Sequence, residues 1–292
     1  MWFEKKKLLI GLGLAIFMGL SCAVYNDSCP VTEPEVWGKF NVNLNISREF
    51  VRQCEAPIGI FIADALHNYK YGLKDGSNDA NPSIGLVNAG AIRDEVSCGT
   101  GEENRDTIPK GPVTNQDIFQ LHPFEDTVVV VKLTGSQLKD VLEWGVSSLG
   151  SGDDDALEGH FLQVSAQGKI EVDIDCSQQQ QTLFEGKTIS NYGSRISTLC
   201  IGNAVPCFVP DGTYYVATLD YLTRTDDKEI PNDGFAAFQQ PGIEVFETHI
   251  PVTEAVREWL KIYSSTEGYR DTDYPKVLNR LNFSNCNNEC SD

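Results

Sequence analysis

Positively charged side chains are scarce in this sequence. Its 292 residues include 23 lysines and arginines against 42 aspartates and glutamates, which leaves a formal charge of −19 with histidine neutral. So acidic a surface repels nucleic acid and anionic membranes, and neither is expected to bind the body of the protein. An anionic small molecule must instead be met by a local group of arginines or by backbone amides, which makes the position of each arginine informative.

The usual signatures of a self-contained catalytic centre are also missing. The sequence has only four histidines, and none lies at metal-ligand spacing from a pair of cysteines. No Ser-His-Asp order and no glycine-rich phosphate loop stands out. No repeat of about 20–50 residues is visible. We therefore expect neither a catalytic residue nor a metal site in this chain.

Long apolar runs are absent apart from one near the N-terminus. There, three lysines at 5–7 precede an apolar stretch over 8–20, and a Ser-Cys-Ala tripeptide follows at 21–23. This arrangement is typical of a signal peptide, predicted over 1–23, and of a protein that is secreted, periplasmic or at the cell surface. The run is short for a bilayer span. A retained anchor helix and a lipid on Cys22 remain alternatives, and they are the only membrane attachments that the sequence indicates.

Cysteine, in contrast, is plentiful. Nine are present, and eight of them follow Cys22. An even number of cysteines in an exported protein indicates disulfides, although the sequence alone does not determine which cysteines pair. Two pairs are close enough in sequence to form local loops, namely Cys200 with Cys207 and Cys286 with Cys290.

The composition, 41% apolar and 22% charged, indicates a packed domain. After the signal peptide we distinguish a polar leader over 24–48, one domain over 49–285 and a short tail over 286–292. Periodicity predicts helices over 55–69 and 252–263 and strands over 83–90 and 212–222. It also predicts two strands joined by a turn at Gly168 over 160–175, and a strand followed by a helix, capped by Thr134 or Ser136, over 126–146. These elements alternate without a regular βαβ rhythm, which predicts an α+β fold.

Residues 86–96, LVNAGAIRDEV, place an amide and a guanidinium on a turn made of small side chains. Ala89, Gly90 and Ala91 separate Asn88 from Arg93. Small side chains let the backbone approach another group closely, and arginine offers a rigid fork for phosphate or carboxylate. Taken alone, the segment is more simply explained as a strand that ends in a tight turn.

Four segments, in their order along the chain, resemble a known family. They are NAGAIR from 88, GPVTNQDIFQLHPFEDTVVVVKLTGSQLKDVLE from 111, HFLQVSAQG from 160, and TYYVATLDYL with NDGF from 213. From about Arg52 to Leu281 the chain is similar to the C-terminal domain of the 5′-nucleotidase family, which includes ecto-5′-nucleotidase and UDP-sugar hydrolase. The resemblance implies a layered α/β/β/α domain that binds the nucleoside, while a separate N-terminal metallophosphatase domain with two metal ions performs the hydrolysis.

The resemblance also implies binding roles for five residues. Asn88 matches an asparagine that contacts the nucleoside, and Arg93 matches an arginine that faces the phosphate. Phe124 and Tyr221 match two aromatic residues that sandwich the base, with phenylalanine usual at the second position. Asp233 matches a carboxylate that accepts hydrogen bonds from the ribose hydroxyls. Without the resemblance, the aromatics would be simpler to explain as core residues and Asp233 as part of an Asp-Gly turn.

Three features depart from the family pattern. Ala91 replaces a glycine, which costs about 1 kcal/mol if the position requires a positive φ. Cys54 stands where the family has a further phosphate-facing arginine, and Arg52, two residues away, need not reach the site. The insertion LTRTDDKEIPN at 222–232 replaces a short glycine-rich link before Asp233 and is expected to alter the rim of the pocket.

The clustered Asp, His and Asn metal ligands of the family's catalytic domain do not occur in this sequence. We therefore expect the chain to bind a nucleotide or nucleoside, and to need a separate dimetal phosphatase domain or chain for hydrolysis. No cofactor is expected in this chain, because the two divalent metals would belong to that catalytic domain. Two alternatives remain: a split or incomplete 5′-nucleotidase that hydrolyses nucleotides once completed, and a secreted structural protein that binds none.

Overall fold

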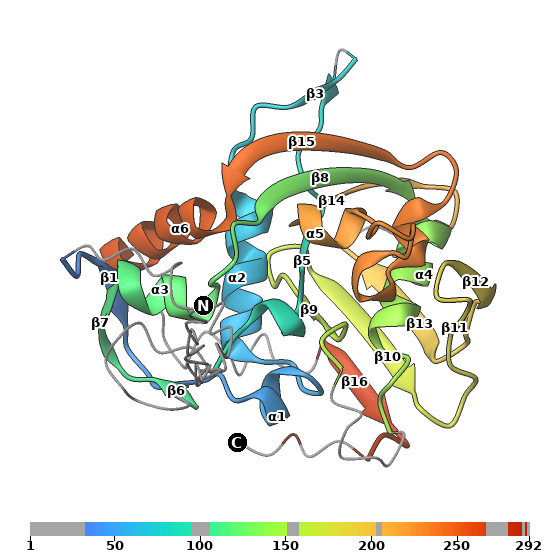
Figure 1. The fold of residues 1–292 in the computed structure, drawn as a ribbon, viewed down its shortest axis with the longest axis horizontal. Coiled ribbons are helices and arrows are strands. Elements are labelled where there is room, and N and C mark those ends of the chain that lie inside the picture. The colour runs from blue at the N-terminus through green and yellow to red at the C-terminus, as the bar shows by residue number, and fades with distance from the viewer. Residues whose placement is uncertain are drawn as a thin grey trace, which may run out of the picture.

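The computed structural model describes residues 33–76, 78–94, 106–150, 158–202, 206–266, 280–287 and 290 (Figure 1). The predicted signal peptide over 1–23, Cys29 and Cys98 lie outside these ranges. Within them, no helix combines the length and the apolar character needed to cross a bilayer. The elements are mixed sheets accompanied by helices, so the predicted α+β class is confirmed.

The centre of the molecule is a five-stranded sheet in the order β15-β8-β14-β5-β9. Its strands are β5 (Ile84–Asn88), β8 (Thr127–Thr134), β9 (Leu162–Val164), β14 (Thr213–Leu219) and β15 (Glu244–Pro251). β5 and β14 run parallel, and the other neighbouring strands are antiparallel. β15 and β8 curve side by side over the top of Figure 1. The valines from Val128 to Val131 are fully buried, as a continuous β-branched run in a sheet covered on both faces requires.

Two predicted helices lie beside this sheet. α2 (Pro57–Asn68) has proline in its first turn, and every residue from Ile58 to Leu66 is buried. It packs directly on β5, because a Cβ atom at Gly85 would overlap the carbonyl oxygen of Ala63. α6 (Val252–Thr266) packs against α2. Glycine in the strand is thus what allows the helix to approach the sheet.

The β8–α4 unit follows its predicted course. α4 spans Gly135–Gly145, and Thr134 rather than Ser136 is its N-cap. Thr134 and Gln137 exchange hydrogen bonds between side chain and backbone in a capping box. Beyond the other end, the buried guanidinium of Arg195 donates hydrogen bonds to the carbonyls of Val146, Ser147 and Leu149. Arg195 therefore fixes the turn that follows α4 to the start of β13.

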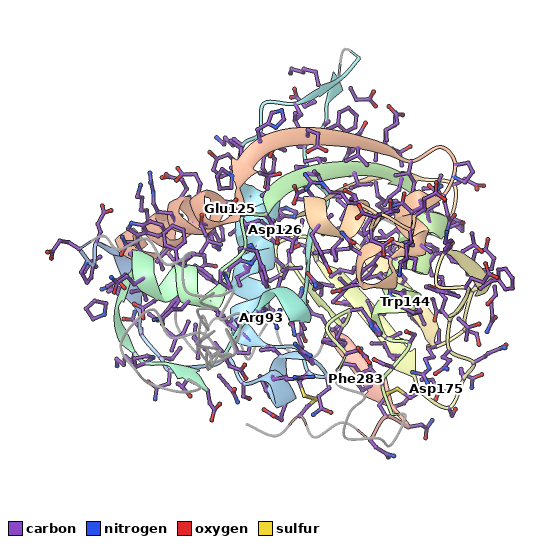
Figure 2. The ribbon with its side chains drawn as sticks, in the orientation of Figure 1. Arg93, Glu125, Asp126, Trp144, Asp175 and Phe283 are labelled. Carbon is purple, nitrogen blue, oxygen red and sulfur yellow. A yellow bond between two sulfur atoms is a disulfide. The ribbon has the colours of Figure 1, made fainter. Side chains whose placement is uncertain are left out.

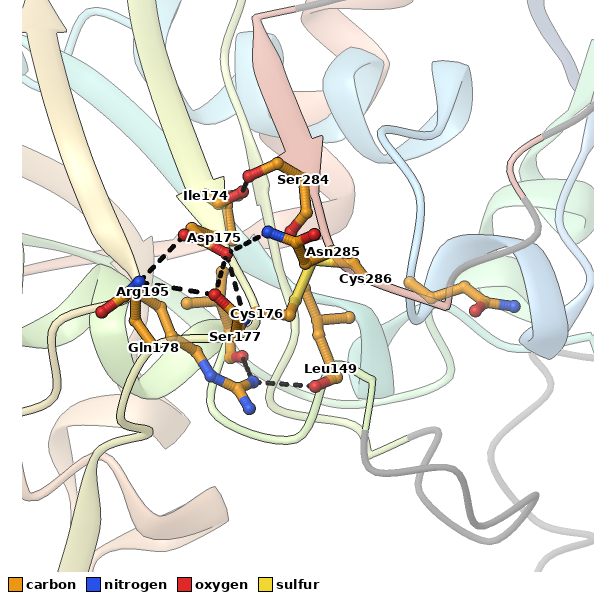
Figure 3. The surroundings of a disulfide bond; sticks show 12 residues. Leu149, Ile174, Asp175, Cys176, Ser177, Gln178, Arg195, Ser284, Asn285 and Cys286 are labelled. Carbon is orange, nitrogen blue, oxygen red and sulfur yellow. Dashed lines mark hydrogen bonds between the residues drawn. A yellow bond between two sulfur atoms is a disulfide. The ribbon is translucent and has the colours of Figure 1, made fainter.

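A second sheet joins β13 (Ile196–Ile201), β10 (Ile170–Asp175) and β16 (Leu281–Ser284) in that order. β16 pairs with β10 in parallel, and a disulfide between Cys176 and Cys286 lies where the two strands end (Figure 3). Beside it, side-chain hydrogen bonds, chiefly from Asn285, hold the pKa of Asp175 well below its usual range. The C-terminal segment is therefore anchored in the fold.

The remaining elements are short. The helices are α1 (Arg48–Val51), α3 (Asn115–Leu121) and α5 (Asp220–Thr223), with 3-10 turns η1 (Ala89–Ala91), η3 (Asn232–Gly234) and η4 (Ala236–Gln239). Antiparallel strand pairs complete the list: β1 (Val36–Phe40) with β7 (Gly111–Thr114), β2 (Leu44–Asn45) with β6 (Thr107–Ile108), β3 (Lys74–Asp75) with β4 (Asn78–Asp79), and β11 (Thr182–Phe184) with β12 (Thr188–Asn191).

Part of the segment assigned to a polar leader belongs to the folded domain. β1 and β2 lie within it, and Phe40, Leu44 and Ile46 are buried in the core. These apolar side chains alternate with polar ones, as in a strand with one buried face. The neighbouring prolines and asparagines made the segment look like a leader by composition. The folded chain therefore begins before residue 49.

Three disulfides join described cysteines: Cys54–Cys290, Cys176–Cys286 and Cys200–Cys207. The last closes the local loop that its spacing predicts. Cys286 and Cys290, although close enough in sequence for a local loop, do not bond each other, because each of these cysteines bonds a partner more than 100 residues away. Closing a short loop costs less entropy, which favours the local pair in an unfolded chain, whereas the folded chain brings distant partners together.

Candidate functional site

The five residues singled out in the sequence line one cavity of about 450 Å³. They come from separate segments: the end of β5 and the turn after it, the connection between α3 and β8, α5, and η3. The other lining residues are Arg52, Gly90, Ala91, Asp126 and Gly159. Figure 2 shows Arg93 and Asp126 near the middle of the view. Phe124 and Tyr221 thus face a shared hollow instead of two separate parts of the core.

The small residues after β5 allow a close approach of two backbones. The amide of Gly90 donates a hydrogen bond to the carbonyl of Gly159 at 2.8 Å. A Cβ atom on Gly90 would lie 3.0 Å from the Cα of Gly159, tighter than an ordinary contact. Ala91 continues the 3-10 turn and does not have a positive φ. The strain considered for alanine at this position is therefore absent.

Asp233 is held by side chains from three other elements. Its carboxylate accepts hydrogen bonds from the Asn88 amide at 2.7 Å and from the Tyr221 hydroxyl at 3.1 Å. Its backbone carbonyl accepts one from the indole of Trp144, on α4, at 2.7 Å. Asp233 has a φ of 47°, a left-handed conformation that aspartate tolerates better than most residues. The insertion before it does not carry it away from the cavity.

Trp144 fits closely beneath the Asp233 turn. It stacks on His160 with ring centres 4.8 Å apart, and a Cβ atom on Gly234 would overlap its indole ring. The sequence predicted only that this tryptophan lies on a helix. Its contact with Asp233 joins residues 89 positions apart and could not be deduced from spacing.

The cavity carries charges of both signs. Arg52 and Arg93 are positive, and Asp126 and Asp233 are negative. The Arg93 guanidinium lies 5.1 Å from the centre of the Phe124 ring, a cation–π contact. Burial, reinforced by the charge of Asp233, raises the pKa of Tyr221 to about 12, so its hydroxyl remains a donor. Such a cavity suits a ligand that combines an anionic group with hydrogen-bond donors.

His122 lies behind the cavity and is neutral near pH 7. Burial lowers the pKa of this histidine to about 4. Its Nδ1 atom is 3.1 Å from the carbonyl oxygen of Ala91. A carbonyl can only accept, so we assign the ring proton to Nδ1. The other nitrogen, Nε2, then carries no proton and lies 3.6 Å from the carboxylate of Asp126.

Arg52 and Asp126 are cavity residues that the sequence analysis did not assign. Arg52, which lies two residues from the family's arginine position and need not reach the site on sequence grounds, follows α1 and lines the cavity. Cys54, which stands where the family has an arginine, is bonded to Cys290 instead. Asp126 could have been noticed, since it comes two residues after Phe124. Across the described ranges, no three His, Cys, Asp or Glu side chains gather in a way that could hold a metal ion.

Comparisons with known proteins agree with this architecture. A family model described as "5′-nucleotidase, C-terminal domain" matches residues 36–239. The trifunctional nucleotide phosphoesterase protein YfkN of Bacillus subtilis is 28% identical over 204 residues, which cover 70% of this chain and 11% of that protein. The 5′-nucleotidase of Rattus norvegicus is 26% identical over 250 residues, 85% of this chain and 36% of that protein.

Solved structures show the same fold. The 5′-nucleotidase precursor from Thermus thermophilus matches with a TM-score of 0.60 at 24% identity, over 85% of this chain and 39% of that one. The NAD nucleotidase of Haemophilus influenzae matches with a TM-score of 0.57 at 20% identity, over 86% and 38%. The chain spans less than half the length of each of these four proteins.

Proposed function

Because this chain belongs to the family of the 5′-nucleotidase C-terminal domain, we propose that it binds a nucleotide or nucleoside in the cavity. The observation that carries the proposal is the convergence of Asn88, Arg93, Phe124, Tyr221 and Asp233, from distant segments, on one hollow. A cavity of about 450 Å³ is within the size range of small-molecule sites. Its aromatic rings, carboxylates and guanidiniums correspond to the base, the ribose and the phosphate of such a ligand.

In the proposed complex the base stacks between Phe124 and Tyr221, and Asp233 accepts hydrogen bonds from the ribose. Arg93 covers a face of the Phe124 ring. That contact contributes about 0.5–1 kcal/mol at an exposed site, whereas a hydrogen bond to a charged group contributes about 1.5–3 kcal/mol. A phosphate therefore draws the guanidinium off the ring and leaves the ring free for the base.

We also propose that hydrolysis requires a dimetal phosphatase domain outside this chain, since the described residues offer no cluster of metal ligands. The alternative, that the chain is part of a 5′-nucleotidase, is favoured by the greater length of its relatives. Release of phosphate from AMP by the purified chain with added divalent cations would contradict the first view. Export to an oxidising compartment is part of the proposal, because the fold joins three pairs of cysteines in disulfides.

Replacing Phe124 by alanine tests the binding mode. Stacking of a base on an aromatic ring contributes about 1–3 kcal/mol, so Phe124→Ala should weaken adenosine binding by that amount. Titration calorimetry measures it, with thermal unfolding to confirm that the variant folds. Phe184→Ala is the matched control, because Phe184 is 62% exposed on β11 and does not line the cavity. Equal affinities in the wild type and a folded Phe124→Ala would remove the stacking model.

Replacing Trp144 by phenylalanine tests how Asp233 is held. The change keeps an aromatic ring but removes the indole N–H that binds the Asp233 carbonyl. We expect adenosine affinity to fall by about 0.5–1.5 kcal/mol as Asp233 leaves its left-handed conformation. Trp259→Phe is the control, since its buried indole N–H meets no acceptor in the described part of the chain. If both variants bind adenosine alike, Trp144 does not position Asp233.

A further inference from the structure

We propose that Asp126 selects nucleobases that carry an exocyclic amino group. The inference rests on the proposed nucleoside binding and adds a chemical preference to it. Asp126 lies two residues after Phe124, in the connection that leads into β8, and its carboxylate lines the cavity. Its side chain is 18% exposed. A base stacked on Phe124 therefore has this carboxylate within the same hollow.

The two carboxylates of the cavity differ in their hydrogen bonds. Asp233 accepts from Asn88 and Tyr221. No side chain or amide of the described residues donates a hydrogen bond to the carboxylate of Asp126. An ionised carboxylate can only accept, so the lone pairs of Asp126 remain free for donors from a ligand. Two acceptor positions of Asp233 are thus occupied by protein donors, whereas the described residues occupy none on Asp126.

The groups that surround Asp126 do not satisfy it. The nearest, Nε2 of neutral His122, has a lone pair where a donor would be needed. Asp220 accepts hydrogen bonds from Thr127 and forms an ion pair with Arg224. The positive charge of Arg224 is therefore shared between Asp220 and Asp126. Burial, followed by the charges of Asp220 and Asp233, raises the pKa of Asp126 to about 6. A ligand N–H facing Asp126 would relieve this unfavourable environment.

Amino groups on bases match this requirement. The exocyclic amines of adenine and cytosine are hydrogen-bond donors. The exocyclic oxygen of thymine or uracil is an acceptor, and it would be repelled by the carboxylate, which is also an acceptor. A site that presents an acceptor rejects ligands which leave it unpaired. Asp126 therefore makes the cavity prefer amino-bearing bases.

The test compares adenosine with purine riboside, which lacks only the amino group. Calorimetry on the full chain should find that the wild type binds adenosine about 10- to 100-fold more tightly, the range expected for one hydrogen bond to a charged group. In Asp126→Ala the ratio should fall to about 1. Asp126→Asn keeps a carbonyl acceptor and the side-chain shape, and it should retain a smaller preference. Glu125→Ala is the matched control, since Glu125 is exposed and does not line the cavity.

The outcomes separate the two proposals. A wild type that binds neither nucleoside contradicts the proposed function itself. A wild type that binds both equally well contradicts the role of Asp126 and leaves nucleoside binding intact. Full preference for adenosine in a folded Asp126→Ala or Asp126→Asn variant also contradicts it, and either variant is sufficient if the other does not fold.

Discussion

Replacing Arg93 by alanine should weaken the binding of AMP by about 2–3 kcal/mol, or roughly 30- to 150-fold, and leave the binding of adenosine at least as tight as before. The phosphate loses its charge-assisted partner. Adenosine has no phosphate and so loses no such contact, and the substitution uncovers the face of Phe124 over which the guanidinium lies. Of the two ligands, only AMP should therefore lose affinity.

Titration calorimetry at one fixed ionic strength measures this difference, because a phosphate contact depends on salt. Arg257→Ala serves as the control. Arg257, on α6, pairs with Glu254 and Glu258 and takes no part in the cavity. An equal loss for AMP and adenosine in Arg93→Ala would show that Arg93 supports the turn rather than the phosphate.

Replacing Arg280 by methionine should lower the free energy of unfolding by about 3–5 kcal/mol, the usual loss when one partner of a buried ion pair is removed. Arg280 binds Glu55 at 2.5 Å, and the two side chains are 10% and 6% exposed. It also donates to the carbonyls of Ser165 and Val164 at 2.6 and 3.0 Å. The variant removes the positive charge of Arg280 from beside the buried carboxylate of Glu55.

Denaturant unfolding measures this loss, and a double variant isolates its cause. Glu55→Gln combined with Arg280→Met removes the buried negative charge as well and should recover part of the stability. Lys261→Met is a surface control, because its pair with Glu258 has side chains 48% and 41% exposed and should contribute at most about 1 kcal/mol. A loss below about 1 kcal/mol in Arg280→Met would mean that the ion pair with Glu55 contributes little to the stability of the fold.

The elements that could be predicted are those with a strong local pattern. α2 was indicated by apolar residues at helical spacing and a proline near its start, and the β8–α4 unit by a valine run followed by a capping threonine. β1 and β2 could not be recognised in the same way. Their apolar residues are few, and their pairing partners, β7 and β6, lie more than 60 residues away.

The residues of the candidate site likewise fall into those that the sequence indicates and those that it does not. Asn88, Arg93, Phe124, Tyr221 and Asp233 were selected by their resemblance to family motifs, and the fold brings all five to one cavity. Arg52, Asp126 and Trp144 were not selected. Arg52 and Asp126 line the cavity, and Trp144 binds the turn that carries Asp233, only because the chain returns to the same place several times.

The sequence by itself determined the α+β class, the acidic surface, the principal helices and strands, and the identity of five cavity residues. These depend on spacing over a few residues, on charge, or on short motifs, all of which are local properties of a chain. The tertiary structure alone decided which cysteines pair, that residues 36–45 join the domain, and that Asp233 accepts hydrogen bonds from Asn88 and Tyr221 whereas Asp126 accepts none from the described residues. Each of these depends on segments far apart in sequence meeting in a packed interior, where distance and burial, rather than spacing along the chain, determine which groups interact.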